Sequence, residues 1–139
     1  MKTGIQVSSL KPLLMTAEQV REAFSQLKAL GCKTVQLQWI DSSVPVEDIA
    51  RALKENQIIS VSVQDFYDLV LENQDYYTRL NAATSGTWLC VSRIPEHLKS
   101  PEGLDRYIAE LRAMQKRLVS QGQKLCFTPF PGTSPQFPV

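Results

Sequence analysis

Residues 16–40 read TAEQVREAFSQLKALGCKTVQLQWI and predict a helix, a glycine stop and a buried strand. Thr16 and Gln19 have the spacing of a capping box, in which two side chains satisfy free backbone N–H groups at a helix start. Gly31 predicts a left-handed C-cap, and residues 34–40 predict a strand. A helix that leads directly into a strand indicates a βαβ unit. The apolar positions of the helix recur at helical spacing and are Val20, Ala23, Phe24, Leu27 and Leu30.

The same alternation of strand and helix continues along the chain. Predicted strands cover residues 4–8, 34–40, 58–64, 87–91 and 124–127. Predicted helices cover residues 16–30, 45–56, 72–83 and 101–121, with a short helical turn at 65–71. We therefore expect residues 1–127 to form one α/β domain of parallel βα repeats. Residues 128–139 contain four prolines in twelve positions and predict an irregular tail.

Polar side chains occupy one face of the first three predicted strands. In the third strand, Ile59, Val61 and Val63 alternate with Ser60, Ser62 and Gln64. The polar set of the three strands includes Gln6, Gln36, Gln38 and Gln64. In a sheet covered by helices on both faces, the central strands tend to be continuously apolar. The polar face therefore favours part of a (βα)8 barrel, although the 139-residue length favours an open doubly wound sheet.

Composition excludes several classes of protein. The formal net charge of +1 gives no electrostatic footprint for nucleic acid or an anionic membrane. No apolar run approaches the roughly 18 residues of a membrane span, and no secretory signal is visible, so we expect a cytoplasmic protein. Neither a GxGxxG nor a GxxxxGK[ST] phosphate loop is present. The three cysteines, Cys32, Cys90 and Cys126, lack metal-ligand spacing and are interpreted as buried thiols in a reducing cytosol.

Four short stretches resemble one family in order and spacing. They are GIQVSS at 4–9, LKALGCKTVQL at 27–37, LKENQIISVSVQ at 53–64 and KLCF at 124–127. Together they resemble the N-terminal half of the sugar phosphate isomerase/epimerase family, xylose isomerase-like TIM barrels related to type 2 apurinic endonucleases. The resemblance covers about four and a half of eight βα units. It implies a half TIM barrel of about four βα units plus a fifth strand.

The resemblance also implies a ligand and a site. Family members act on a sugar or sugar phosphate, and a full-length member uses a divalent metal to hold two substrate oxygens. The glutamines Gln6, Gln36, Gln38 and Gln64 would line the barrel mouth and bind substrate hydroxyls. Trp39 would offer an apolar platform to a sugar ring.

This sequence departs from the family at its metal-binding positions. Gln36 stands where the family often has Glu, and Gln64 where the third strand often ends in His. Residues 128–130 read Thr-Pro-Phe in place of His-x-His. The family's metal ligands lie mostly on strands five to eight. We therefore expect no catalytic residue, no metal and no activity in this chain alone.

Three further interpretations remain open. One is that the chain is a truncated or frameshifted form of a longer barrel protein. Another is a non-catalytic half-barrel that forms a homodimer and closes a barrel, because exposed sheet edges are liabilities unless paired. The last is a flavodoxin-like open sheet that binds a small ligand, with the SSLKP loop at residues 8–12 contacting a phosphate.

Overall fold

A computed structural model describes residues 4–128 of the chain. Five strands alternate with helices along these residues. The strands are β1 (Ile5–Gln6), β2 (Thr34–Gln38), β3 (Ile59–Phe66), β4 (Trp88–Ser92) and β5 (Lys124–Thr128). The α-helices are α1 (Ala17–Ala29), α2 (Val46–Glu55), α3 (Tyr67–Glu72), α4 (Gln74–Ala83) and α5 (Pro101–Ser120). Two short 3₁₀ helices, η1 (Val7–Leu13) and η2 (Glu96–Leu98), complete the set.

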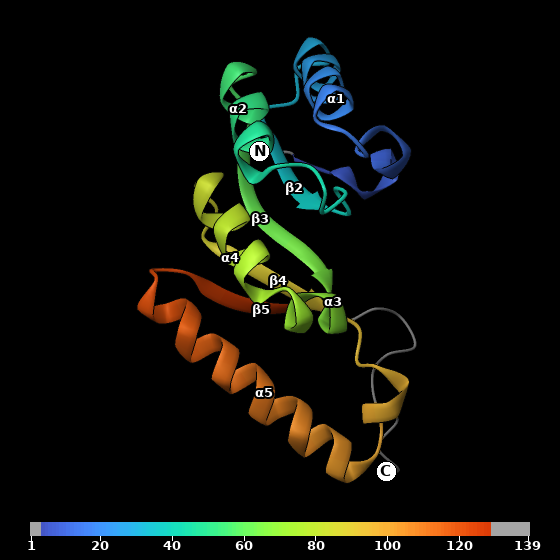
Figure 1. Ribbon diagram of the computed structural model, residues 1–139, viewed down its shortest axis with the longest axis vertical. Coiled ribbons are helices and arrows are strands. Elements are labelled where there is room, and N and C mark those ends of the chain that lie inside the picture. Colours follow the sequence, from blue (N-terminus) through green and yellow to red (C-terminus); the bar gives the residue numbers. More distant parts are fainter. Residues whose placement is uncertain (1–3, 129–139) are drawn as a thin grey trace.

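The strands form one parallel sheet whose spatial order, β1-β2-β3-β4-β5, follows the sequence. Helices α2, α4 and α5 lie along one side of this sheet, with α1 next to α2 (Figure 1). A doubly wound sheet reverses its strand order at a switch point, and this sheet has no reversal. The topology therefore confirms the predicted α/β half-barrel arrangement rather than the flavodoxin-like one.

The helix ends confirm the predicted caps. The backbone N–H of Gln19 donates to Thr16 Oγ1 at 3.2 Å, and Gln19 Oε1 in turn accepts from the backbone of Met15 at 3.1 Å. Gly31 has a φ of 82°, the left-handed conformation that ends α1. The predicted apolar face of α1 is wrong at its last position, because Leu30 follows the final turn and is 82% exposed.

Several predicted boundaries are wrong at the strand ends. The first strand stops at Gln6, because residues from Val7 onward wind into η1. The second stops at Gln38, because Trp39 has a φ of 59° and leaves the pleated conformation. Thr128, placed in the predicted tail, is the last residue of β5. The remainder of the predicted tail, residues 129–139, lies outside the described residues.

A β-bulge changes the faces of the third strand. Val35 pairs with Ser60 while the next residue, Gln36, pairs with Ser62, so Val61 is an extra residue in β3. The predicted apolar face therefore fails: Ile59 and Val61 are 64% and 48% exposed, whereas Ser60 is buried. Alternation resumes above the bulge, where Val63 lies in the core.

The main core lies between the sheet and the helices. It joins buried residues of the strands to those of α1, α2, α4 and α5. A smaller cluster of Tyr67, Ile94, Leu98 and Tyr107 packs the start of α5 against α3 and η2. None of the described helices is long and apolar enough to cross a membrane.

Candidate functional site

The four predicted glutamines lie on one face of the sheet, opposite the main core. Strand register sets Gln6 beside Gln36, and Gln38 beside Gln64. Asp65, one position past Gln64, reaches Tyr77 on α4, so the glutamines face away from that helix. We call this side the helix-free face. Its lower row is Gln6, Gln36, Ser62, Trp88 and Lys124, and its upper row is Gln38, Gln64, Cys90 and Cys126.

Side-chain hydrogen bonds connect the lower row across three strands. Gln6 Nε2 donates to Gln36 Oε1 at 3.0 Å, and Gln36 Nε2 donates to Ser62 Oγ at 2.9 Å. Gln6 is exposed and Gln36 is half-buried, so both remain within reach of a ligand. Ser8 Oγ also donates to Gln6 Oε1, at 3.3 Å. The structure therefore brings these two predicted residues together as one chain of polar groups.

The upper row is more deeply buried and lies nearer the carboxyl ends of the strands. Gln38 and Gln64 are 3% and 2% exposed. Thr128 Oγ1 donates to Gln64 Oε1 at 3.4 Å, a bond that spans from β5 to β3. Gln38 Oε1 has no hydrogen-bond partner within residues 4–128. A buried acceptor without a partner carries a desolvation cost, and a hydroxyl donor from a ligand or water would remove it.

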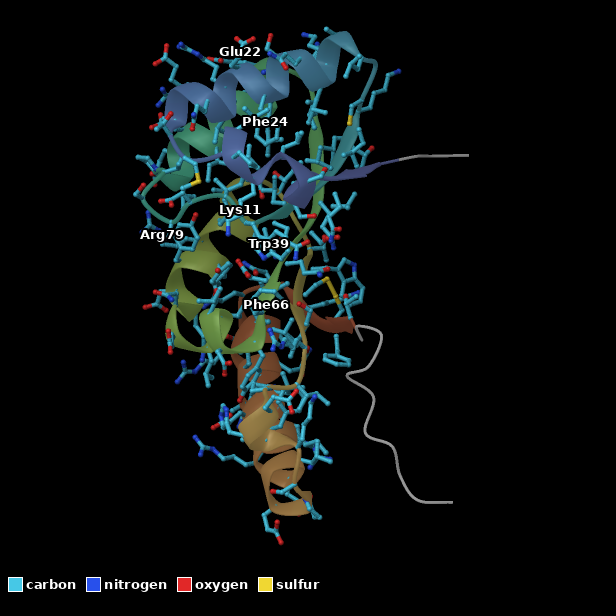
Figure 2. All side chains as sticks on the ribbon, turned by 90° about the vertical axis from the view of Figure 1, so that its right-hand side faces the viewer. Lys11, Glu22, Phe24, Trp39, Phe66 and Arg79 are labelled. Carbon is cyan, nitrogen blue, oxygen red and sulfur yellow. A yellow bond between two sulfur atoms is a disulfide. The ribbon has the colours of Figure 1, made fainter. Side chains whose placement is uncertain are left out.

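Two aromatic rings and two cations lie at the carboxyl ends of β2, β3 and β4. The ring centroids of Trp39 and Phe66 are 5.6 Å apart, and Lys11 Nζ lies 5.7 Å from the Trp39 centroid. Figure 2 shows Lys11, Trp39 and Phe66 close together. Arg93 Cζ lies 5.8 Å from the Phe66 centroid, on the residue that follows β4. The two distances from a cation to a ring fall within the range of cation–π attraction. We call Lys11, Trp39, Phe66 and Arg93 the rim.

Sequence reasoning found Trp39 in this group and missed the others. Lys11 lies in η1, which the sequence presents as a connector. Phe66 and Arg93 were not distinguished because strand ends are set by tertiary packing as well as by pattern. Like Trp39, Arg93 has a left-handed backbone, with a φ of 65°. Trp39 and Arg93 therefore lie where the extended conformation of β2 and β4 ends.

A buried carboxylate underlies this rim. Tyr77 Oη donates to Asp65 Oδ2 at 2.7 Å, and the backbone N–H of Phe66 donates to Asp65 Oδ1 at 2.8 Å. Burial raises the pKa of Asp65, while the Tyr77, Phe66 and Trp39 hydrogen bonds lower it and oppose that effect. Burial also raises the pKa of Tyr76 to about 12. The Tyr76 hydroxyl is buried and has no partner among residues 4–128.

The cysteine prediction is wrong for two of the three residues. Cys90 and Cys126 are register partners on β4 and β5, with Cα atoms 4.6 Å apart, and form a disulfide. That separation is within the range a disulfide spans. Their sequence separation of 36 conceals this proximity, because only strand pairing brings the two together. Cys32 is a free thiol and is half-buried.

The donor set does not fit the divalent metal that the family resemblance implies. Where a carboxylate and an imidazole would be needed, the helix-free face has the amides of Gln36 and Gln64. Within residues 4–128, no group of three or more His, Cys, Asp or Glu side chains could hold an ion. We derive no chemical step through a metal.

Solved structures share this fold at low sequence identity. A family 2 AP endonuclease from Brucella melitensis is 17% identical, with a TM-score of 0.71. The match covers 96% of this chain and 57% of the endonuclease chain. A xylose isomerase-like TIM barrel protein from Mycobacterium smegmatis, in complex with magnesium, is 11% identical with a TM-score of 0.73 (97% and 57% coverage). The fold of this chain matches half of a TIM barrel.

A third structure extends this likeness to an epimerase. The 3-keto-D-glucoside 4-epimerase from E. coli, in its apo form, is 18% identical with a TM-score of 0.61, and covers 91% of this chain and 55% of its own. The chain thus spans about half the length of the structures it matches. No protein-family model and no curated protein matches the sequence. In the half-barrel, the helix-free face corresponds to the barrel interior.

Proposed function

We propose that this chain is the sugar-binding half of an isomerase- or epimerase-type barrel and has no metal-assisted catalysis of its own. The observation that carries the proposal is the pair of glutamine rows on the helix-free face. Barrel enzymes place their sites at the carboxyl ends of the strands, where the upper row lies. The likeness to an epimerase and to a xylose isomerase-like protein supports a carbohydrate as the ligand.

Side-chain amides suit carbohydrate hydroxyls because each amide both donates and accepts hydrogen bonds. Gln6 and Gln36 are accessible, and Gln38 Oε1 offers an acceptor that no described residue occupies. Trp39, the residue after β2, adds an aromatic ring next to Gln38. Lys11 Nζ, 5.7 Å from the Trp39 centroid, adds a positive charge that favours an anionic substituent. A sugar phosphate therefore fits this rim better than a neutral sugar does.

Calorimetric titration tests the proposal with D-xylose, D-glucose and glucose 6-phosphate as probes. We expect saturable binding that is tightest for the phosphate. Gln36→Ala and Lys11→Ala weaken it, because they remove an amide and a charge from the site. Gln26→Ala is the matched control, since the Gln26 side chain is exposed on α1 and donates to Glu22 Oε1 at 2.9 Å. Absence of binding to all three probes, or equal loss in the control, contradicts the proposal.

The absence of metal chemistry is tested separately by thermal unfolding in Mn²⁺ and Mg²⁺. A preformed ion site raises the midpoint with concentration through linkage. We expect no saturable shift with either ion, because amides replace the charged donors. A clear, saturable increase would contradict the reasoning on the donor set while leaving the carbohydrate proposal standing.

A second function is supported by a different observation on the same face. Apolar side chains on this face are open to solvent: Trp88, in the lower row, is 41% exposed, and Ile59, below it, is 64% exposed. β1 and β5 each pair with one strand only in the described sheet. A second copy of this chain would cover the face and close a barrel as a homodimer.

Sedimentation velocity at micromolar concentration tests self-association. We expect a dimer that Ile59→Lys converts to monomer, because the charge falls in the buried interface. Leu30→Lys is the matched control, since Leu30 is 82% exposed at the end of α1, away from this face. A wild-type monomer, or equal dissociation by both variants, excludes this mode of pairing.

A further inference from the structure

The disulfide lies in the upper row of the helix-free face, beside a proposed ligand-binding residue. Register places Gln64, Cys90 and Cys126 next to one another on β3, β4 and β5. Thr128, two residues after Cys126, donates to Gln64 Oε1 at 3.4 Å. The bond that joins β5 to β4 is thus adjacent to a contact between β5 and Gln64.

The two ends of β5 are held in different ways. At the start, Gln123 Oε1 accepts from Asn81 Nδ2 at 2.9 Å, and Gln123 Nε2 donates to the Thr78 carbonyl at 3.0 Å. The Leu125 N–H also donates to Gln115 Oε1, at 2.8 Å. These bonds anchor the first residues of the strand to α4 and α5 without help from the disulfide.

The carboxyl end of β5 has fewer contacts with the helices, among them the Phe127 ring, whose centroid lies 6.2 Å from that of Tyr107 on α5. No residue of β5 is fully buried, and the strand pairs with β4 alone in the described sheet. The disulfide cross-links residues 126–128 of β5 to β4 through Cys126 and Cys90. Strand ends with few buried contacts open at low free-energy cost.

We propose that Cys90 and Cys126 form a redox site whose oxidation state sets the position of the carboxyl end of β5. The pair exchanges with a dithiol. One thiolate of the dithiol attacks Cys126 Sγ, on the less buried of the two residues, and the Cys90 thiolate leaves. The second thiolate of the dithiol then displaces Cys126 and forms a cyclic disulfide. The protein gains two thiols, the dithiol loses two electrons, and the freed end of β5 moves Thr128 away from Gln64.

The effect on ligand binding rests on the proposed carbohydrate site, whereas the opening of the pair does not. Amide hydrogen exchange of the full chain, with and without dithiothreitol, reports the opening without any ligand. The Lys124 N–H donates to the carbonyl of Thr87, the residue before β4. Because alternate residues of a strand point their N–H groups to the same side, the N–H groups of Cys126 and Thr128 also point toward β4. We expect both to exchange about tenfold faster or more after reduction, while the amides of Gln123 to Leu125 and of β2 stay protected.

Two variants keep the experiment decisive. Cys32→Ser retains the pair and is expected to respond to dithiothreitol as the wild type does. Cys126→Ser is expected to show fast exchange at Thr128 without reductant and no further change with it. Alkylation in a denaturing quench should rise from one cysteine to three on reduction.

Three results would overturn the proposal. They are unchanged exchange at Thr128 after full reduction, a uniform rise through β2 and α1 that indicates global unfolding, and three free thiols in protein purified without reductant. Absence of carbohydrate binding in both redox states, with normal opening of the pair, would count against the proposed ligand site alone.

Discussion

Replacing Tyr77 with phenylalanine removes one hydrogen bond from a buried carboxylate and leaves the ring in place. The Tyr77 hydroxyl donates to Asp65 Oδ2 at 2.7 Å, and Asp65 is buried. Hydrogen bonds to charged groups contribute about 1.5–3 kcal/mol to stability. We expect Tyr77→Phe to lower the free energy of unfolding by about 2 kcal/mol at neutral pH.

The size of this loss depends on pH. Burial raises the pKa of Asp65, so folding disfavours its ionised form. The free energy of unfolding therefore falls as the pH rises from the pKa of Asp65 in the unfolded chain through its higher pKa in the folded protein. The Tyr77 bond opposes this by favouring the carboxylate, and Tyr77→Phe raises the Asp65 pKa further. The penalty of the variant is therefore largest at neutral pH and shrinks in acid, where Asp65 is protonated in both proteins.

The neighbouring tyrosine provides the matched control. The Tyr76 hydroxyl is buried without a partner among residues 4–128, so Tyr76→Phe removes a desolvated polar group and no hydrogen bond. We expect it to be neutral or stabilising by up to about 1 kcal/mol. Urea unfolding of the wild type and both variants, near pH 7 and near pH 4, measures the three free energies. Equal losses for the two variants, or a Tyr77→Phe loss that grows in acid, would refute the reasoning.

Three further substitutions test local structure by the same urea unfolding. Thr16→Ala should cost about 1 kcal/mol, because it removes the cap that accepts from Gln19, and a neutral result would contradict the capping box. Gly103→Ala should cost about 1–3 kcal/mol despite the helix propensity of alanine, because its Cβ would lie 2.7 Å from the Leu98 Cα. A gain in stability would show that the backbone moves to make room for the Cβ. Gly31→Ala should cost about 1 kcal/mol through the left-handed φ of 82° alone, since nothing lies within 4 Å of the new Cβ, and no loss would mean that the helix end adjusts.

Local signals in the sequence are sufficient to predict most of the fold. Thr16, Gly31 and Ser100 act at short range, and the structure confirms the cap, the left-handed residue and the helix start that they predict. Alternating polarity on the first strands correctly favours a barrel-like sheet over a doubly wound one. These features depend on neighbours within a few residues, which the sequence displays directly.

Features that depend on strand pairing could not be predicted. The extra residue Val61 exists only in relation to β2, so simple alternation misassigns Ile59. Cys90 and Cys126 meet through register over a separation of 36 residues. In the candidate site, the glutamine row was visible as a polar face, but Lys11 and Phe66 join it through tertiary packing, which no local pattern encodes.

Side-chain amide NMR most directly tests the central claim, that the glutamine rows bind carbohydrate. Titrating glucose 6-phosphate into ¹⁵N-labelled protein should give saturable shifts of the Gln6, Gln36 and Gln38 side-chain amides. The Gln26 amide on α1 should stay unchanged. Shifts confined to Gln26 or other helix surfaces, or none at all up to millimolar sugar phosphate, would contradict the account.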